Sequence, residues 1–454
     1  MYREKLKVMT PSRNKLIYLL PLFVIELYLL FTLIVLNYGP VTYKLHNVYS
    51  FYLFIIFYHI AFILGYLYSA NKLYSGDARY FGFTTGCETF IIKYFWIFYF
   101  FALIASLIMF KNAVNNQSII PYNIFEKINL GLHNPRLARD MTNYSYSSSP
   151  QNSVFITFFY ALTAVFRYSL LPIMIFFWGR LNLLKKVFGS ILAFFPLTAA
   201  VSTGTNAYAI LIFFVAFVSI LILILRKLYF KEHIKHFKLT IITAFSMVII
   251  CISVFLIVMS SRMNTQDLYS MELAAPKGEV VFSKSIENSG IVASFAKIDF
   301  YLVQGYYGMS LALSEEFTPT YGVGSSQYLL VFIDKHLGTN LNENTYQHKI
   351  TRKWDEKAAW HSFYSQMAND FSFIGVIFLM FVLGIVVASV YITGVIYNNI
   401  FAKLLLPLLA IMILFIPMNN YVGNNMELLV SFVILILLWL KSILKRKNIN
   451  VSMS

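Results

Sequence analysis

Long apolar runs recur along this chain and are separated by shorter polar stretches. A bilayer with a hydrocarbon core about 30 Å thick is crossed by roughly 20 helical residues. Because the runs are continuously apolar and do not alternate, they predict membrane-spanning helices and not the strands of a membrane barrel. Ten runs have suitable lengths, at approximately 16–37, 50–70, 94–110, 153–178, 187–202, 206–225, 239–259, 372–396, 404–418 and 426–440.

Two of the ten runs are shorter than a typical span. They are 187–202 and 404–418, and the second contains Pro407 and Pro417. Proline removes a helical hydrogen bond and kinks the backbone, so each run also fits one arm of a re-entrant or kinked pair. The first run, 16–37, is followed by no small-residue cleavage site, and we therefore interpret it as a span and not as a signal peptide.

Composition supports the same class of protein. Apolar residues make up 59% of the 454 positions and charged residues 12%, whereas a soluble domain carries about 25% charged residues. Such a chain cannot cover itself with a water-soluble surface. The prediction is an all-α polytopic membrane protein with about ten transmembrane helices.

Basic residues cluster between the apolar runs and predict the orientation. Short loops rich in Lys and Arg remain in the cytoplasm. Ten spans place all four clusters on one side, with both termini cytoplasmic in the bacterial inner membrane. The net charge of +16 then reflects topology and contact with anionic membrane lipids, and we expect no nucleic-acid partner. The clusters lie at 3–15, 180–186, 226–238 and 441–447.

Motifs for nucleotide, metal or disulfide chemistry do not appear. The sequence has no GxxxxGK[ST], no HExxH and no GxSxG. The two cysteines, Cys87 and Cys251, are predicted in a cytoplasmic loop and inside a span, where they cannot pair. We therefore expect no cofactor and no metal.

Acidic residues concentrate in the second of two long outer loops, 111–152 and 260–371. The second loop holds 12 of the chain's 20 acidic residues but 9 of its 36 basic ones. At this length it is more than a connector, and we expect a large, partly helical periplasmic loop. The chain then divides into 1–259 with seven helices, the loop, and 372–454 with three helices and a cytoplasmic tail.

Three stretches of the large loop have distinct patterns. Residues 298–313 are apolar and aromatic but too short to span, which favours a helix at the membrane interface. Residues 317–326 are rich in turn formers. Residues 345–369 predict a polar helix that runs into the next span.

Arginines at the outer face match the geometry of phosphate. Arg262 follows the span 239–259, and Arg136 and Arg139 are spaced i, i+3 in the other outer loop. A planar guanidinium binds phosphate oxygens in a bidentate manner, so these residues are candidates for binding a lipid diphosphate. The alternative is simple anchoring at the membrane interface.

The stretch 345–369 also carries candidates for acid–base chemistry. His348, Arg352 and Asp355 fall at i, i+4 and i+7, on one face of the predicted helix. His361 and Asp370 follow near the next span, where an imidazole or carboxylate can accept a proton from an attacking hydroxyl. Ordinary exposed ion pairs are the alternative.

Three ionisable residues fall in or beside spans, namely Glu26, Arg167 and Glu427. Burying a charged side chain within a membrane costs free energy, so a charged residue there is first interpreted as a functional one. The alternative for Arg167 is a structural salt bridge with Glu26.

Three segments resemble the Wzy-type O-antigen and oligosaccharide repeat-unit polymerases: YLVQGYYGMSLAL, PTYGVGSSQYL and WHSFYSQMANDFSFIGVIFLMFVLGIV. That family carries a glycine-rich aromatic patch, a p-x-y-G-x-G turn and a D-F-G-x-x-G motif before a span. Here Ser372 replaces the first glycine of the last motif. A family G-S-R sequence reads Gly204, Thr205 and Asn206, without the arginine. The motif similarity covers about 300–395.

The resemblance implies a GT-C-like fold and a metal-independent glycosyltransferase. Its donor is an undecaprenyl-diphosphate-linked oligosaccharide, its site is at the periplasmic face, and a Wzz-type chain-length regulator is the implied partner. Candidates to bind the diphosphate are Arg136, Arg139, Arg167 and Arg262. Candidates for catalysis are Arg352, His361 and Asp370. Candidates to bind sugar are Tyr301, Tyr306, Tyr307 and His348.

Two other functions remain open. An O-antigen ligase uses the same donor but transfers the glycan to lipid A core. A flippase for lipid-linked oligosaccharides belongs to another class, and transporters of that kind tend to contain inverted repeats, which this sequence does not display.

Overall fold

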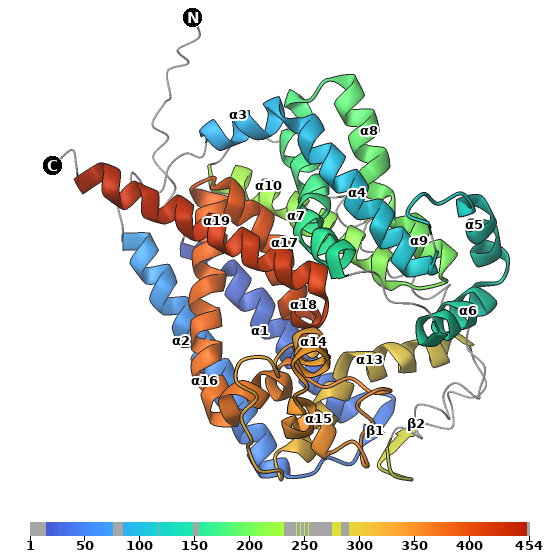
Figure 1. Cartoon of the computed structure of the whole chain (residues 1–454). Coiled ribbons are helices and arrows are strands. Elements are labelled where there is room, and N and C mark those ends of the chain that lie inside the picture. The colour runs from blue at the N-terminus through green and yellow to red at the C-terminus, as the bar shows by residue number, and fades with distance from the viewer. Residues whose placement is uncertain are drawn as a thin grey trace, which may run out of the picture.

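The computed structural model describes residues 15–75, 85–116, 118–148, 154–230, 275–282 and 290–451, with the single positions 242, 246, 249 and 253. In these residues the chain is mainly helical (Figure 1). The α-helices are α1 (Lys15–Tyr38), α2 (Val48–Ser75), α3 (Thr85–Lys93), α4 (Phe95–Val114), α5 (Ile124–His133), α6 (Pro135–Ser148), α7 (Val154–Phe177), α8 (Leu183–Phe194), α9 (Pro196–Ser202), α10 (Ala207–Tyr229), α13 (Gly290–Ala312), α14 (Gln327–Leu337), α15 (Tyr346–Lys349), α16 (Phe363–Tyr391), α17 (Ile400–Leu414), α18 (Tyr421–Asn424) and α19 (Met426–Val451). Strands β1 (Val41–Tyr43) and β2 (Val280–Phe282) pair antiparallel.

Eight helical segments in the described residues are long and apolar enough to cross a membrane, which confirms a multi-pass, all-α membrane protein. The short predicted span 187–202 becomes a 20-residue segment, Leu183–Ser202, because α8 continues into α9 at Pro196. The other short prediction, 404–418, corresponds to α17, which has only 15 residues. The predicted span 239–259 lies outside the described residues except for four single positions.

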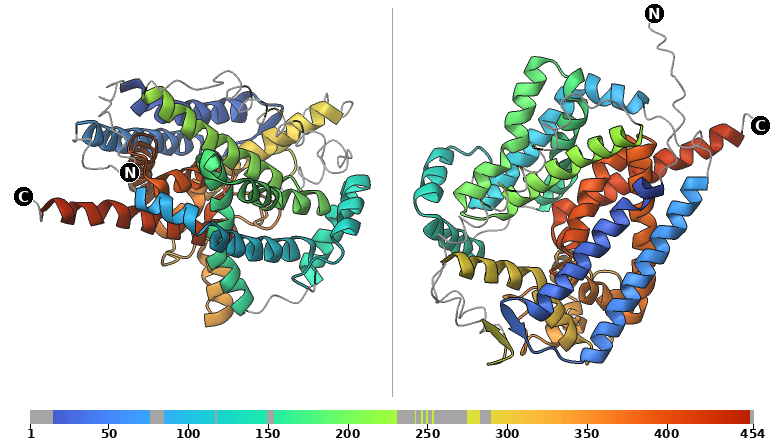
Figure 2. Two further views of the ribbon diagram at one scale, coloured as in Figure 1. Left: turned by 90° about the horizontal axis from the view of Figure 1, so that it is seen from above. Right: turned by 180° about the vertical axis from the view of Figure 1, so that it is seen from behind.

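Close helix packing depends on small residues. Helix α2 lies along α16 (Figures 1 and 2), and glycines stand where their backbones meet. A Cβ at Gly65 would collide with the Phe381 carbonyl, and one at Gly384 with the Phe62 carbonyl. Without side chains at these points the two helices approach closely enough for dispersion contacts, the main attraction between helices in lipid.

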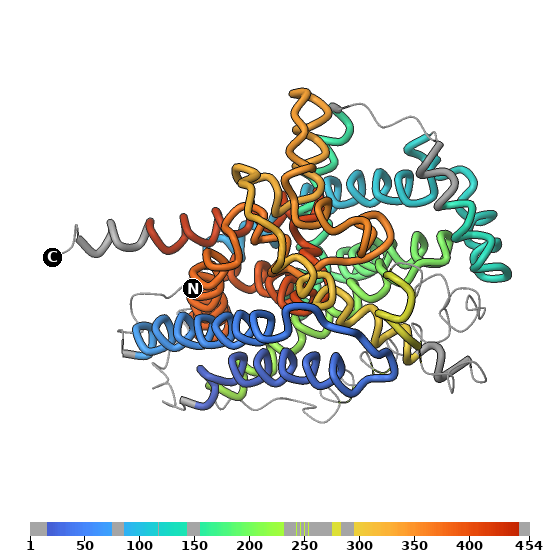
Figure 3. Tube along the Cα trace, turned by 90° about the horizontal axis from the view of Figure 1, so that it is seen from below, coloured from blue at the N-terminus to red at the C-terminus, as the bar shows by residue number. Residues whose placement is uncertain are grey.

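Strands β1 and β2 and helices α13, α14 and α15 gather at one end of the helical bundle, the lower end in Figure 1. Figure 3 looks onto this end, where the segment between α13 and α16 folds over the helices. The predicted helix at 298–313 is part of α13, but its apolar side chains are buried inside the protein. The fully or nearly buried side chains include Phe300, Val303, Tyr306, Tyr307 and Met309.

The predicted helix over 345–369 is wrong. Only α15 is helical there before α16 begins at Phe363. The chain between them folds around Trp354, which is fully buried and donates its indole N–H to the Trp360 carbonyl at 3.0 Å. Burial of this one large side chain outweighs the helical spacing of the polar residues around it. His348, Arg352 and Asp355 therefore do not form a helical stripe.

Basic residues from two predicted cytoplasmic clusters lie at one end of the bundle. Arg180 binds Glu88 at 3.1 Å, and Lys403 approaches the same carboxylate at 3.9 Å. Lys185 donates to the Ile92 carbonyl, and Arg226 donates to the Val395 carbonyl. This grouping agrees with the charge pattern, and the side on which the cytoplasm lies remains a prediction.

Helix α16 is kinked at Ser372, the position where the resembled motif has glycine. Its φ of 58° and ψ of 166° belong to a region that glycine occupies almost alone. The Ser372 hydroxyl accepts a hydrogen bond from the Gly375 N–H at 3.3 Å and so caps the second part of the helix. The strain and the cap therefore have opposite effects on stability.

Replacing Ser372 with glycine is expected to stabilise the protein by about 1 kcal/mol. Glycine relieves a strain of about 1–3 kcal/mol, while the loss of a serine cap to glycine costs only a few tenths. Ser372→Ala keeps the strain and loses the cap, so it is expected to destabilise by about 1 kcal/mol. Unfolding midpoints of the purified proteins in one detergent would test this order, and a less stable glycine variant would contradict it.

Candidate functional site

A cavity of about 470 Å³ opens between α6, α10, α13 and α19. This volume falls within the range of small-molecule sites, which are mostly apolar with a few polar groups. The lining also includes the ends of α4 and α17 and the turn between α9 and α10. It consists of Ala113, Arg139, Thr142, Tyr168, Thr203, Thr205, Asn206, Ala207, Tyr208, Ile210, Leu211, Ile298, Tyr301, Leu302, Trp360, Leu414, Phe415, Met418, Tyr421, Asn425, Glu427 and Leu428.

Aromatic rings form a continuous wall of this cavity. The rings of Tyr301 and Trp360 have centroids 4.9 Å apart, and those of Trp360 and Phe415 are 6.4 Å apart. Phe415 stacks on Tyr421 at 4.2 Å. The Trp360 backbone is fixed, because its N–H donates to Gln304 Oε1 at 2.9 Å. This aromatic wall (Tyr301, Trp360, Phe415 and Tyr421) is preorganised to bind a flat apolar surface such as the C–H face of a sugar ring.

The turn between α9 and α10 brings small polar groups to the cavity. Gly204 has a φ of +57°, and a Cβ there would collide with the Pro135 carbonyl at the start of α6. The start of α6 therefore packs directly against this turn. Thr203 and Thr205 of the turn line the cavity, and their hydroxyls are 2.9 Å apart. Arg139 lies one helical turn along α6 from this contact.

Arg139 supplies a cation to the cavity. The side chain is partly buried and makes no ion pair or hydrogen bond with any described residue. Partly desolvated cations attract anions more strongly than exposed ones. Arg139 is therefore available to an anionic ligand without breaking an existing interaction.

Glu427 faces the same cavity from the first turn of α19. Its partner is Arg167, whose Nη2 lies 3.9 Å from Glu427 Oε1, and the Arg167 side chain is only 7% exposed. From the sequence, Glu26 was the alternative structural partner of Arg167. That pairing is wrong, since Glu26 binds His59 Nδ1 at 2.6 Å.

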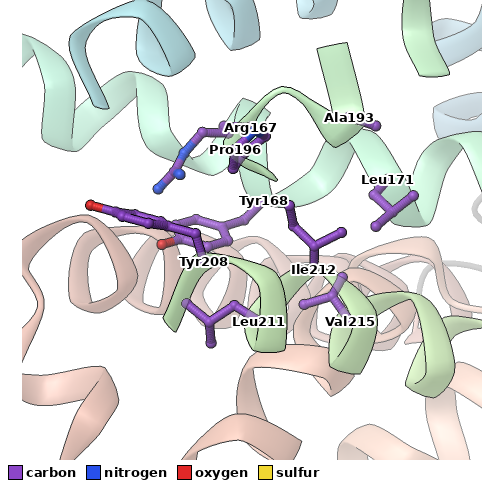
Figure 4. Close-up of a pocket in the computed structure, with 9 residues that line it drawn as sticks. All are labelled: Arg167, Tyr168, Leu171, Ala193, Pro196, Tyr208, Leu211, Ile212 and Val215. Carbon is purple, nitrogen blue, oxygen red and sulfur yellow. The ribbon is translucent and has the colours of Figure 1, made fainter. Parts of the chain in front are cut away.

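A second, smaller cavity of about 40 Å³ adjoins the first (Figure 4). Tyr168, Tyr208 and Leu211 line both cavities. Figure 4 shows the Arg167 guanidinium beside the rings of Tyr168 and Tyr208, and it stacks over the Tyr168 ring at 4.4 Å. Arg167 is thus behind the wall of the larger cavity and does not line it.

The tyrosines predicted to bind sugar are separated by the fold. Tyr301 lines the cavity, but Tyr306 and Tyr307 are fully buried. The Tyr306 hydroxyl lies 3.1 Å from Thr32 Oγ1, and Tyr307 donates to the Glu279 carboxylate. Both hydroxyls are therefore used within the protein core.

Asp370 holds the turn-rich segment 317–326 in place. Its Oδ1 accepts from Thr320 Oγ1 at 2.5 Å, Gly322 N at 2.8 Å and Gly324 N at 3.2 Å. Its Oδ2 accepts from Ser325 N at 2.8 Å. Since both oxygens are occupied, this geometry favours a structural role over proton transfer.

His361 is enclosed, with only 3% of its surface exposed. Burial lowers the pKa of the imidazole to about 3, so the ring is neutral at physiological pH and a weak base. Neither ring nitrogen has a hydrogen-bond partner among the described residues. Its neighbour Trp360, not His361, lines the cavity.

The other predicted residues that the structure describes do not line the cavity. His348 Nδ1 is 3.2 Å from Glu356 Oε1, and Arg352 and Arg136 are exposed. Arg262 lies outside the described residues. Within the described part of the chain no group of three or more His, Cys, Asp or Glu residues is placed to hold a metal ion.

Several residues that line the cavity were not among the candidates predicted from the sequence, and others were noted without a proposed role. Trp360 lies in a segment quoted for the family resemblance, and Glu427 was noted only as an intramembrane charge. Thr203, Phe415 and Tyr421 carry no distinguishing pattern in the sequence. Comparisons with models of known families, with curated proteins and with solved structures find no match for this chain.

Proposed function

We propose that this protein is a membrane glycosyltransferase that joins lipid-linked oligosaccharide repeat units, as the resembled Wzy-type polymerases do. The observation that carries the proposal is a single cavity that combines the aromatic wall with Arg139, which has no ion-pair partner among the described residues. A diphosphate-linked glycan presents these two chemistries together, a charged diphosphate and sugar rings with apolar faces.

Each side of the cavity suits one part of this donor. Arg139 offers charged hydrogen-bond donors to the diphosphate. Tyr301 and Trp360 offer ring faces to the sugars. The family's G-S-R arginine is Asn206 here, and Arg139 from α6 lines the same cavity as Asn206. In this proposal a different helix supplies the missing cation.

The wider proposal follows the resemblance and the charge pattern. The fold is GT-C-like, the cavity opens at the periplasmic face of a bacterial inner membrane, and both termini are cytoplasmic. The donor is an undecaprenyl-diphosphate-linked oligosaccharide. A Wzz-type regulator in the same membrane sets the length of the product.

Reconstitution tests the proposed activity directly. Membranes from a strain that lacks the gene supply the lipid-linked repeat unit, and the purified protein in liposomes is added back. We expect a ladder of lipid-linked glycans without any lipopolysaccharide core. Product that forms only when lipid A core is supplied would indicate a ligase instead. Movement of the glycan across the bilayer without new glycosidic bonds would indicate a flippase.

A further inference from the structure

We infer that Glu427 is the proton acceptor of the transfer reaction. This inference rests on the proposed glycosyltransferase function. It assigns to Glu427 the role that the sequence suggested for Asp370 or His361. Three features of the described residues carry it: access to the cavity, free carboxylate oxygens and a counter-charge that leaves those oxygens open.

Access distinguishes Glu427 from the other candidates. It is the one carboxylate among the described residues that line the cavity, and its side chain is 20% exposed. His361 and Asp370 do not belong to the lining. A base must come within hydrogen-bond reach of the hydroxyl that it deprotonates, and Glu427 alone of the three faces space where a sugar can bind.

The oxygens of Glu427 are also free. They accept no hydrogen bond from any residue that the structure describes, whereas those of Asp370 accept four. A carboxylate with satisfied oxygens is a poor acceptor for a substrate proton, because existing bonds must break first. Glu427 can accept a hydrogen bond from a substrate hydroxyl without that cost.

Arg167 neutralises Glu427 without covering it. Their closest nitrogen–oxygen distance is 3.9 Å, longer than a hydrogen bond. A purely structural pair would favour the bidentate fork in which two N–H groups meet two oxygens. Instead Arg167 Nε and Nη2 have no hydrogen-bond partner among the described residues.

The step balances as a displacement at the anomeric carbon of the donor. The acceptor hydroxyl gives its proton to Glu427, and its oxygen forms the new bond to the anomeric carbon. The bond from that carbon to the diphosphate oxygen breaks, and its electron pair leaves with undecaprenyl diphosphate, whose charge Arg139 stabilises. Glu427 then returns the proton to water. Arg167 acts here as a positioning residue that places its positive charge 3.9 Å from the carboxylate.

The test compares Glu427→Gln, Glu427→Asp and the control Glu126→Gln in the reconstituted assay. Glu126 is an exposed acid on α5 that does not line the cavity. Glu427→Gln is expected to lower kcat by at least about 100-fold, the usual contribution of a general base. The KM for the lipid-linked donor should stay within about threefold, since donor contacts remain. The control should keep wild-type activity.

A second variant covers the case in which Glu427→Gln does not fold. Glu427→Asp keeps the charge but withdraws the carboxylate by one methylene group, so we expect kcat to fall at least about tenfold with an unchanged donor KM. Wild-type kcat in either variant would overturn the role of Glu427 and leave the proposed function intact. Absence of polymerisation by the wild-type protein would overturn both.

Discussion

Replacing Arg139 with alanine is expected to reduce polymerisation of lipid-linked units by at least about 100-fold. The leaving diphosphate gains negative charge in the transition state, and removing one preorganised group that stabilises such charge typically costs 10²–10³ in rate. Arg139 makes no ion pair in the described structure, so its whole charge is available to the ligand. Arg139→Lys should recover part of the rate, since an ammonium keeps the charge but loses the bidentate fork.

Arg136 provides a matched control on the same helix. It lies three residues before Arg139 and has the same side chain, but it is exposed and does not line the cavity. Arg136→Ala should therefore stay within about threefold of the wild-type rate. Initial rates at saturating donor, with equal amounts of folded protein in each liposome sample, give the comparison. Equal losses in the two variants would mean that α6 attracts anionic lipid in general and does not bind the diphosphate specifically.

The membrane class could be read from the sequence because apolar length is a local property. Each predicted run needs only its own residues, and eight helices of sufficient length appear in the described chain. The helix predicted over 345–369 is wrong because of a contact with a distant part of the chain. Trp354 is buried against Phe300 and Tyr307 of α13, and no periodicity in 345–369 reports that contact.

The cavity was only partly predictable for the same reason. Arg139 and Tyr301 were identified from their types and positions, and both line it. The partner of Arg167 was not identifiable, because Glu26 and Glu427 are both intramembrane acids and only the packing of α7 on α19 selects Glu427. Phe415 belongs to a general excess of aromatic residues, 18% of the chain, so composition cannot distinguish it.

Asp370 stands at the start of the stretch that resembles the D-F-G-x-x-G motif, and it was expected to transfer a proton. Its contacts favour a structural role instead. The acid and the glycine-rich turn at 317–326 are separate parts of the family resemblance, about 50 residues apart. In the structure they form one unit, since the carboxylate accepts N–H groups from Gly322, Gly324 and Ser325. Successive backbone N–H groups that converge on one anion form a nest. Here the anion is part of the protein.

Removing this internal anion is expected to unfold the turn. Asp370→Ala leaves three backbone N–H groups without their acceptor. It also removes one of the two acceptors of the fully buried Thr320 hydroxyl, which keeps the Asn369 carbonyl. Hydrogen bonds to charged groups are worth about 1.5–3 kcal/mol each and are not additive, so we expect a loss of about 3–5 kcal/mol in unfolding free energy. Hydrogen exchange at residues 320–326 should rise together with that loss.

Asp370→Asn separates the structural role from a catalytic one. The asparagine oxygen can replace Oδ1 as acceptor, but its NH₂ group would face the Ser325 N–H, which is itself a donor. We therefore expect partial destabilisation and activity that falls only as far as the folded fraction does. Asp355→Ala is the matched control, because the carboxylate of this exposed acid accepts one hydrogen bond from the described residues, from the Lys357 N–H. If Asp370→Asn were fully folded yet inactive, Asp370 and not Glu427 would be the proton acceptor, and the turn would have to open for the substrate to reach it.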